Sequence, residues 1–160
     1  MIRSLNEVAA LAGKAARGAG APAAQATRFG QAAVQHLCAG RDPQALTRAL
    51  AALPGGPILD LPLALMQQAE AQVVEGGFET KGWDTLARSY VAALPFAATL
   101  NEKNLLWIDL NTPAKRSPVA RCDLPEDLCA DWQALAAKTL VPETDASRLG
   151  GAGAGLLDND

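Results

Sequence analysis

The stretch that decides the fold runs from Ser4 to Gly40 and reads SLNEVAALAGKAARGAGAPAAQATRFGQAAVQHLCAG. Ser4 and Glu7 have the spacing of a capping box, in which each side chain bonds a backbone amide at the start of a helix. Apolar residues recur at helical spacing on both sides of the segment RGAGAP, residues 17–22, where glycines and a proline interrupt a helix. The stretch therefore predicts two helices joined by a tight turn.

Each of these two helices carries one apolar stripe. The stripes comprise Leu5, Val8, Ala12 and Ala15 in the first helix and Ala26, Phe29, Ala33 and Leu37 in the second. Half of these side chains are alanines, so the two backbones can approach closely, and we expect the four larger side chains to be buried. Gly40 and the pair Asp42–Pro43 end the second helix.

The sequence after the hairpin predicts shorter helices and a few strands. Helices are expected at 42–53, 62–74 and 84–94. Strands are expected at 58–59, 96–100, 104–110 and 117–121. A last long helix opens at 123–126. This pattern indicates an α+β fold, with an N-terminal helical hairpin or bundle, a small antiparallel sheet and one further helix in the second half.

The chain has 160 residues, which is typical of a single domain, 1–160. We expect a helical part at about 1–75, a strand-containing part at about 78–145 and a glycine-rich C-terminal tail at 147–160. A chain of this length buries roughly 68–70 % of its unfolded surface, so it needs neither a disulfide nor a metal to fold.

Charge and apolar patterning argue against two classes of partner. The net charge is -3 and no basic run or basic–aromatic interleaving occurs, so we expect no nucleic-acid binding. No apolar run approaches the ~20 residues of a membrane span, so we expect no membrane partner. Asn6 and Glu7 also interrupt what would be the core of a signal peptide. Scattered cysteines, Cys38, Cys122 and Cys129, fit reduced thiols, and we expect a cytoplasmic protein.

A second distinctive stretch, SRLGGAGAGLLDND, occupies residues 147–160. Together with SLNE at 4–7 and AARGAG at 15–20, its motifs SR, GAGAG and DND resemble the two ends of a bacterial domain-of-unknown-function family. The resemblance covers only the termini. It implies one small bacterial domain and transfers no activity and no catalytic residue.

The two glycine-rich segments each lie beside an arginine, and together they predict a site for an acidic ligand. Guanidinium groups offer paired donors to a carboxylate or phosphate, and bare glycine amides allow an anion to approach closely. The candidate ligand-binding residues are Arg17, Gly18, Gly20, Arg148, Gly151, Gly153, Asp158 and Asp160. Plainer interpretations exist: a cation at a helix C-terminus complements the dipole, and the tail is an arm that ends in solvated aspartates.

The sequence lacks the motifs of common catalytic and cofactor sites. The glycines of the tail are not followed by the Lys-Ser/Thr of a P-loop, and no metal-ligand spacing occurs, so we expect neither a cofactor nor a metal. His36 is the only histidine and is expected to be a core residue. Trp83, Trp107 and Trp132 are likewise expected to be core anchors.

Two functions from different classes stay open. The first is a small-molecule protein, enzymatic or not, that binds a small acidic metabolite where the Arg17–Gly20 turn meets the Arg148–Gly155 tail. The second is a non-catalytic interaction subunit, in which the alanine-rich hairpin packs on a protein partner and the tail docks as an arm. A tail that lies over a pocket of its own chain would favour the first function, and one that extends away would favour the second.

Overall fold

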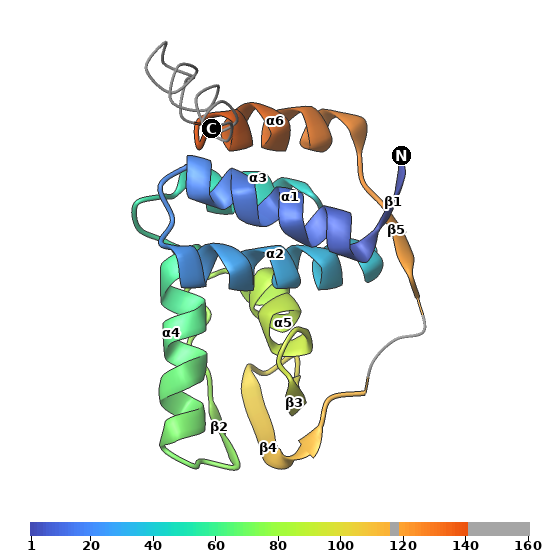
Figure 1. Ribbon diagram of the computed structural model, residues 1–160. Coiled ribbons are helices and arrows are strands. Elements are labelled where there is room, and N and C mark those ends of the chain that lie inside the picture. Colours follow the sequence, from blue (N-terminus) through green and yellow to red (C-terminus); the bar gives the residue numbers. More distant parts are fainter. Residues whose placement is uncertain (116–118, 141–160) are drawn as a thin grey trace, which may run out of the picture.

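The structure is a computed structural model that describes residues 1–115 and 119–140 (Figure 1). Within these residues the chain forms six helices and two small antiparallel sheets, so the predicted α+β fold is confirmed. The elements are, in order, β1 (Ile2–Ser4), α1 (Leu5–Gly18), α2 (Ala23–Cys38), α3 (Gln44–Ala51), α4 (Pro57–Glu70), β2 (Glu75–Gly77), α5 (Asp84–Ala92), β3 (Phe96–Leu100), β4 (Leu105–Pro113), β5 (Arg121–Asp123) and α6 (Glu126–Ala137). No helix in this described part has the length and apolar character needed to cross a membrane.

Helices α1 and α2 form the predicted hairpin. The capping box is present at the start of α1: the Glu7 amide donates to Ser4 Oγ at 3.3 Å, and the Ser4 amide donates to Glu7 Oε2 at 2.9 Å. The chain turns at Gly20, whose φ of +102° lies in the left-handed region that favours glycine. The Ala21 amide closes the turn by donating to the carbonyl oxygen of Ala16 at 2.8 Å.

The two helices pack closely through small residues. Gly30 of α2 lies so near α1 that a Cβ on it would collide with a backbone carbonyl oxygen of that helix. Val8 and Phe29 are fully buried, whereas Leu5 and Leu37 are half-buried and pack against the core. The expected burial is therefore complete for two of the four larger residues and partial for the other two.

The remaining helices surround the hairpin (Figure 1). Helix α6 lies along α1 and runs in the same direction, while α4 and α5 pack against α2. At Gly18 the backbones of α1 and α6 approach so closely that a Cβ would collide with the carbonyl oxygen of Leu135. Trp132 of α6 is fully buried, and side chains from helices and strands together form one continuous core.

The three-stranded sheet has the order β2-β4-β3, and both pairs are antiparallel. The strands expected at 96–100 and 104–110 are confirmed as β3 and as most of β4. Strand β2 has no signal in the sequence, which instead predicts a helix as far as residue 74. Helix α4 ends at Glu70, and Gly76 and Gly77 pair with β4.

One expected strand is wrong, and another differs in its bounds. Residues 58–59 lie in the first turn of α4, which begins at Pro57, since Gly56 with φ +79° turns the chain and a proline suits the first helical position. Pro62, which the sequence suggests as the helix start, lies inside α4. Of the strand expected at 117–121, residues 117 and 118 lie outside the described residues, residues 119 and 120 are not in a strand, and Arg121 begins β5, which pairs with β1 in a separate ribbon.

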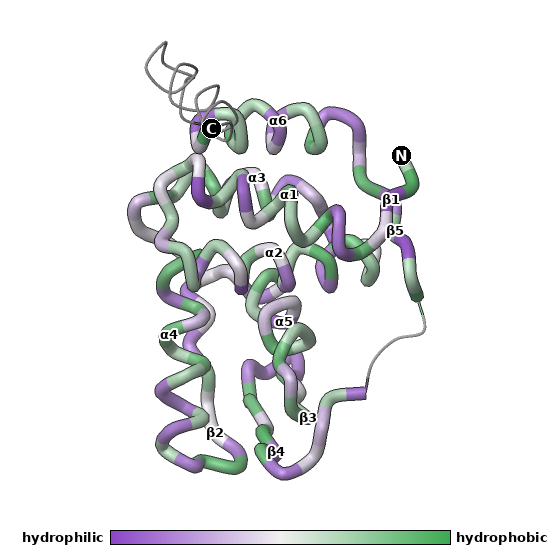
Figure 2. The backbone as a smooth tube through the Cα atoms, in the orientation of Figure 1, coloured by the Kyte–Doolittle hydropathy of each residue, from purple (hydrophilic) through white to green (hydrophobic). Residues whose placement is uncertain are grey.

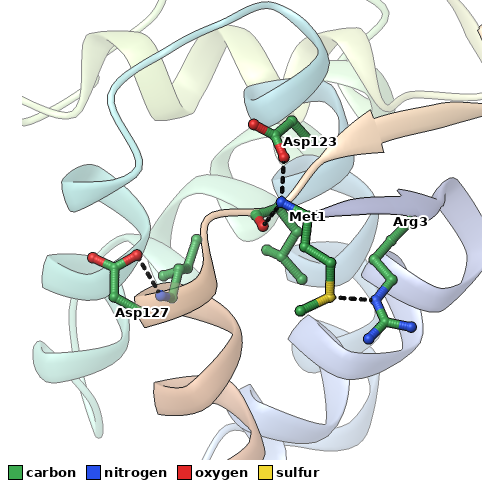
Figure 3. A network of polar contacts seen from close by, with 6 residues as sticks. Met1, Arg3, Asp123 and Asp127 are labelled. Atoms are coloured by element: carbon green, nitrogen blue, oxygen red, sulfur yellow. Dashed lines mark hydrogen bonds and ion pairs between the residues drawn. The ribbon is translucent and has the colours of Figure 1, made fainter.

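The ribbon of β1 and β5 ties the start of the chain to the start of α6 (Figure 3). The amino group of Met1 donates to Asp123 Oδ1 at 2.6 Å and to the carbonyl oxygen of Leu124 at 3.1 Å. The Leu124 amide returns a bond to the carbonyl oxygen of Met1 at 2.9 Å. Asp127, in the first turn of α6, accepts the amide hydrogen of the next residue at 2.8 Å. These bonds fix the point from which α6 runs along α1.

Candidate functional site

The first half of the predicted ligand site lies at the end of α1. Arg17 is exposed in the last helical turn, and its guanidinium group makes no hydrogen bond or ion pair with another described residue. Unpaired carbonyl groups give this end of the helix a partial negative charge, and the cation of Arg17 complements it. This is the structural role that the sequence offers as an alternative to ligand binding. Gly18 packs under α6, and Gly20 forms the turn with open space around it. One of the two glycines therefore has a packing role that the sequence alone does not reveal.

The second half of that site lies outside the described residues. It comprises Arg148, Gly151, Gly153, Asp158 and Asp160. The described chain does lead toward Arg17, because α6 passes Gly18 at Leu135 and ends two residues later at Ala137. The chain that follows residue 140 thus starts at the end of the molecule where the α1–α2 turn lies (Figure 1).

A cavity of about 450 Å³ lies between α4 and the segment 77–83. One wall is a stripe of α4 at helical spacing that includes Asp60, Ala64 and Gln67, and Thr80 and Lys81 belong to the other wall. Lys81 Nζ and Asp60 Oδ2 lie 3.4 Å apart, so the two walls are joined by an ion pair. The hydroxyl of Thr80 already donates to Asp84. Asp60, Thr80 and Lys81 are therefore already committed to partners within the chain.

A second cavity, of about 310 Å³, lies between α1 and α6. Its polar lining includes Arg3, Glu7, Lys14 and Gln133. Hydrogen bonds from Ser4 lower the pKa of the Glu7 carboxyl, which is committed to the capping box. Arg17 lines neither of these two cavities, so neither of them is the predicted acidic-ligand site.

His36 is fully buried in a polar network with Ser89, Arg41 and the backbone of Asp42. Its Nε2 lies 2.9 Å from the carbonyl oxygen of Asp42, which only accepts, so Nε2 carries a hydrogen. Its Nδ1 lies 2.9 Å from Ser89 Oγ, which also accepts from Arg41 Nη1 at 3.0 Å. The prediction of a core histidine is confirmed.

The hydroxyl hydrogen of Ser89 has two acceptors within reach, Nδ1 of His36 and the carbonyl oxygen of Thr85 at 2.9 Å. Donation to Thr85 would leave two acceptors, Ser89 Oγ and Nδ1 of His36, facing each other unless Nδ1 also carried a hydrogen, which makes the ring a cation. Burial lowers the pKa of His36 and so favours the neutral ring, which accepts from Ser89. Since neither side chain reaches solvent, this pair stabilises the core and is closed to a substrate.

One face of the three-stranded sheet is open in the described part of the chain. Along β4 the side chains alternate, so that Leu106 is buried while Leu105 and Trp107 are each 37% exposed. In register, Glu75 of β2 and Thr99 of β3 flank Trp107. Figure 2 shows how hydrophobic β4 is over its first half.

Residues that share the orientation of Trp107 form a surface that we call the open sheet face. They are Glu75, Gly77, Ala97, Thr99, Leu105, Trp107 and Asp109. The expectation that the tryptophans are core anchors therefore holds for Trp132 but is wrong for Trp107. The sequence gives no signal for this difference, because a strand residue is buried only if another element covers its face.

Charge is divided between the helical and the sheet-containing parts. Residues 1–53 are basic, with Arg3, Lys14, Arg17, Arg28, Arg41 and Arg48 against Glu7 and Asp42. Residues 54–113 are acidic, with Asp60, Glu70, Glu75, Glu79, Asp84, Glu102 and Asp109 against Lys81, Arg88 and Lys103. The open sheet face, which contains Glu75 and Asp109, thus belongs to the acidic part.

The cysteines are free thiols, with Cys38 exposed and Cys122 and Cys129 buried. Across residues 1–115 and 119–140, no three side chains of the metal-ligating types are grouped so as to hold a metal ion. No family model matches the chain, and searches of curated proteins and of solved structures give no match.

Proposed function

We propose that the protein is a non-catalytic interaction protein that binds a protein partner through its open sheet face. The observation that carries the proposal is Trp107, which lies in the middle strand of the sheet and is exposed to solvent. Tryptophan side chains are enriched at the centres of protein interfaces, where their large apolar surface leaves water. His36 and Ser89, the obvious acid–base pair, are buried away from solvent, and this supports a non-catalytic role.

The partner is a protein segment that combines apolar side chains with lysine or arginine. Glu75 lies directly opposite Trp107 in the β2–β4 register, and Asp109 follows two residues later on the same face. Hydrogen bonds from Thr112 and from the Asn111 amide lower the pKa of Asp109, so this carboxylate stays charged at neutral pH. An apolar centre with a carboxylate rim selects a partner with cations around an apolar anchor.

The test uses the full-length protein as bait for a displayed library of random peptides. Enriched peptides should carry aromatic or aliphatic residues together with lysine or arginine, and their affinity should fall as salt is raised. Trp107→Ser should weaken binding by about 2 kcal/mol, roughly 30-fold, as expected for an interface tryptophan.

Met66→Gln is the matched control. Met66 is an apolar residue of α4 with 44% exposure, outside the open sheet face, so its replacement should leave affinity and melting temperature unchanged. Peptides that bind wild type and Trp107→Ser equally well would contradict the proposal. Self-association that Trp107→Ser abolishes would instead make a second copy of the chain the occupant and overturn the assignment of a basic partner.

The acidic-ligand site is a second candidate function, and one observation favours it. Helix α6 passes Gly18 and carries the chain to the end of the molecule where Arg17 is exposed. In this proposal Arg17 and Arg148 bind the carboxylates of a small metabolite. Glycines of the tail supply close backbone contacts. Substitution of both arginines tests it.

A further inference from the structure

We propose that Cys38 and Cys122 form a reversible disulfide, which makes the junction of α2 and β5 a redox-controlled crosslink. Cys38 is the last residue of α2, and Cys122 is the middle residue of β5. The two elements are far apart in sequence but contact each other in the fold. The C-terminal end of α2 lies beside β5 (Figure 1), and the thiol of Cys38 is near enough to that of Cys122 to influence its pKa.

The two thiols differ in access, and this difference assigns their order of reaction. Cys38 is exposed and can be reached by a dissolved reagent, whereas Cys122 is only 7% exposed. Burial and then the neighbouring Cys38 raise the pKa of Cys122 to about 11, so that this thiol stays protonated at neutral pH. Cys38 is therefore the thiol that reacts first, and Cys122 is the thiol that completes the bond.

The oxidant is a low-molecular-weight disulfide such as oxidised glutathione. Cys38 loses its proton to solvent and attacks one sulfur of the reagent, which forms a mixed disulfide and expels one glutathione thiolate. Cys122 then loses its proton and attacks the sulfur of Cys38, and the second glutathione thiolate leaves. The two thiolates take up the two protons. Two protein thiols are thus oxidised while one reagent disulfide is reduced to two thiols.

The crosslink acts on the packing of α6. Strand β5 leads directly into α6, and α6 covers α1. A bond between residues 38 and 122 encloses a long segment of chain, and disulfides that close long loops restrict the unfolded chain strongly. Oxidation should therefore raise the resistance of the fold to heat and urea, and reduction should reverse the change.

The experiment exposes the full-length protein to oxidised glutathione, traps the remaining free thiols by alkylation and maps the products by mass spectrometry. The oxidised protein should lose two hydrogen atoms and yield a linked peptide pair that contains Cys38 and Cys122. Cys129 should be alkylated after denaturation. The oxidised protein should melt at a higher temperature than the reduced protein, and dithiothreitol should restore the original value.

Single substitutions separate the two steps. Cys122→Ala should stop at a mixed disulfide on Cys38, Cys38→Ser should give neither product, and Cys129→Ala should crosslink like wild type. Because Cys38 is exposed, its variant tests the proposal even where a buried variant fails to fold. A wild-type protein that shows no crosslink, a link that involves Cys129, or a covalent dimer joined through Cys38 would overturn the proposal.

Discussion

The carbonyl oxygen of Leu135 lies against Gly18, in the space that a Cβ at position 18 would fill. Helices from opposite ends of the described chain thus meet backbone to backbone. Only glycine allows an approach of this kind. The residue that ends α1 is therefore also the residue that lets α6 lie along it.

We expect Gly18→Ala to lower the free energy of unfolding by about 1–3 kcal/mol, the usual cost of overpacking. Helix propensity alone predicts the opposite sign, because alanine is favoured over glycine in a helix by about 1 kcal/mol. Urea denaturation measures the sign of the change in unfolding free energy and so distinguishes overpacking from helix propensity. Gly55→Ala is the control, since a Cβ there would meet its nearest atom at an ordinary 3.8 Å. A stabilised Gly18→Ala variant would mean that the two helices lie farther apart.

Phe29 tests the core of the hairpin. It is fully buried in α2, so truncation to alanine removes its contacts and leaves a cavity. We expect Phe29→Ala to cost about 3–5 kcal/mol of unfolding free energy. Gln31→Ala, at an exposed position of the same helix, should change stability by less than about 0.5 kcal/mol. Equal stabilities of the two variants would remove Phe29 from the core.

The buried histidine predicts a pH dependence of stability. Burial lowers the pKa of His36 below its usual 6.5, so the unfolded chain takes up a proton at a higher pH than the folded chain. Stability is then fully present above pH 6.5 and falls as the pH drops below that value, by at most about 1.4 kcal/mol per pH unit. The measurement is the free energy of unfolding by urea between pH 5 and 8.

The control for this prediction is His36→Gln, which removes the only histidine of the chain. Its stability should be lower throughout, because the network with Ser89 is lost, but nearly constant across this pH range. The carboxyls of Glu7 and Asp84, whose pKa values are lowered by hydrogen bonds, act only at more acidic pH. A variant that kept the slope of the wild type would show that another group causes it.

The sequence predicts the elements that have their own local signals. The α1–α2 hairpin has a capping box, glycines and a proline at its turn, and apolar stripes at helical spacing. Strand β4 has a run of apolar and β-favouring residues, LLWI, followed by Asp109. These features act over a few residues, and the structure confirms both elements.

The elements that the sequence does not predict depend on distant partners. Strands β1, β2 and β5 have three residues each, with the sequences IRS, EGG and RCD, and of these residues only Arg121 falls in a strand that the sequence predicts. Each exists because a remote segment pairs with it, as Ser4 does with Arg121 and Gly77 with Leu105.

The candidate sites show the same limit. Trp107 is apolar in any reading of the sequence, and whether it belongs to the core or to a surface depends on which sheet face the helices cover. Gly18 is read as a turn residue because its true neighbour, Leu135, is more than a hundred residues away. Cys38 and Cys122 appear unrelated in the sequence until the fold places β5 at the end of α2.

The acidic-ligand proposal requires the tail to lie against the body of the protein, and two apolar residues of the tail favour such docking. Leu156 and Leu157 follow the glycine run, and burying each against the body would contribute about 1.5–3 kcal/mol. Ordering a glycine-rich segment is entropically costly, so docking must bring close backbone contacts in return. A tail docked at the α1–α2 turn brings Arg148 to Arg17, and two cations at one place are unfavourable unless carboxylates of Asp158, Asp160 or a ligand neutralise them.

Two changes to the full-length chain therefore test this proposal together. Truncation after Asp145 should lower the melting temperature, because the apolar residues of the tail are lost. The double substitution Arg17→Ala, Arg148→Ala should abolish the stabilisation by dicarboxylates and phosphorylated acids in a thermal-shift screen. Arg28→Ala, an exposed arginine of α2, should leave that stabilisation intact. A truncated protein that melts like the full chain, with rapid hydrogen exchange over residues 147–160, would exclude a docked tail, and Arg17 would then serve only to complement the dipole at the end of α1.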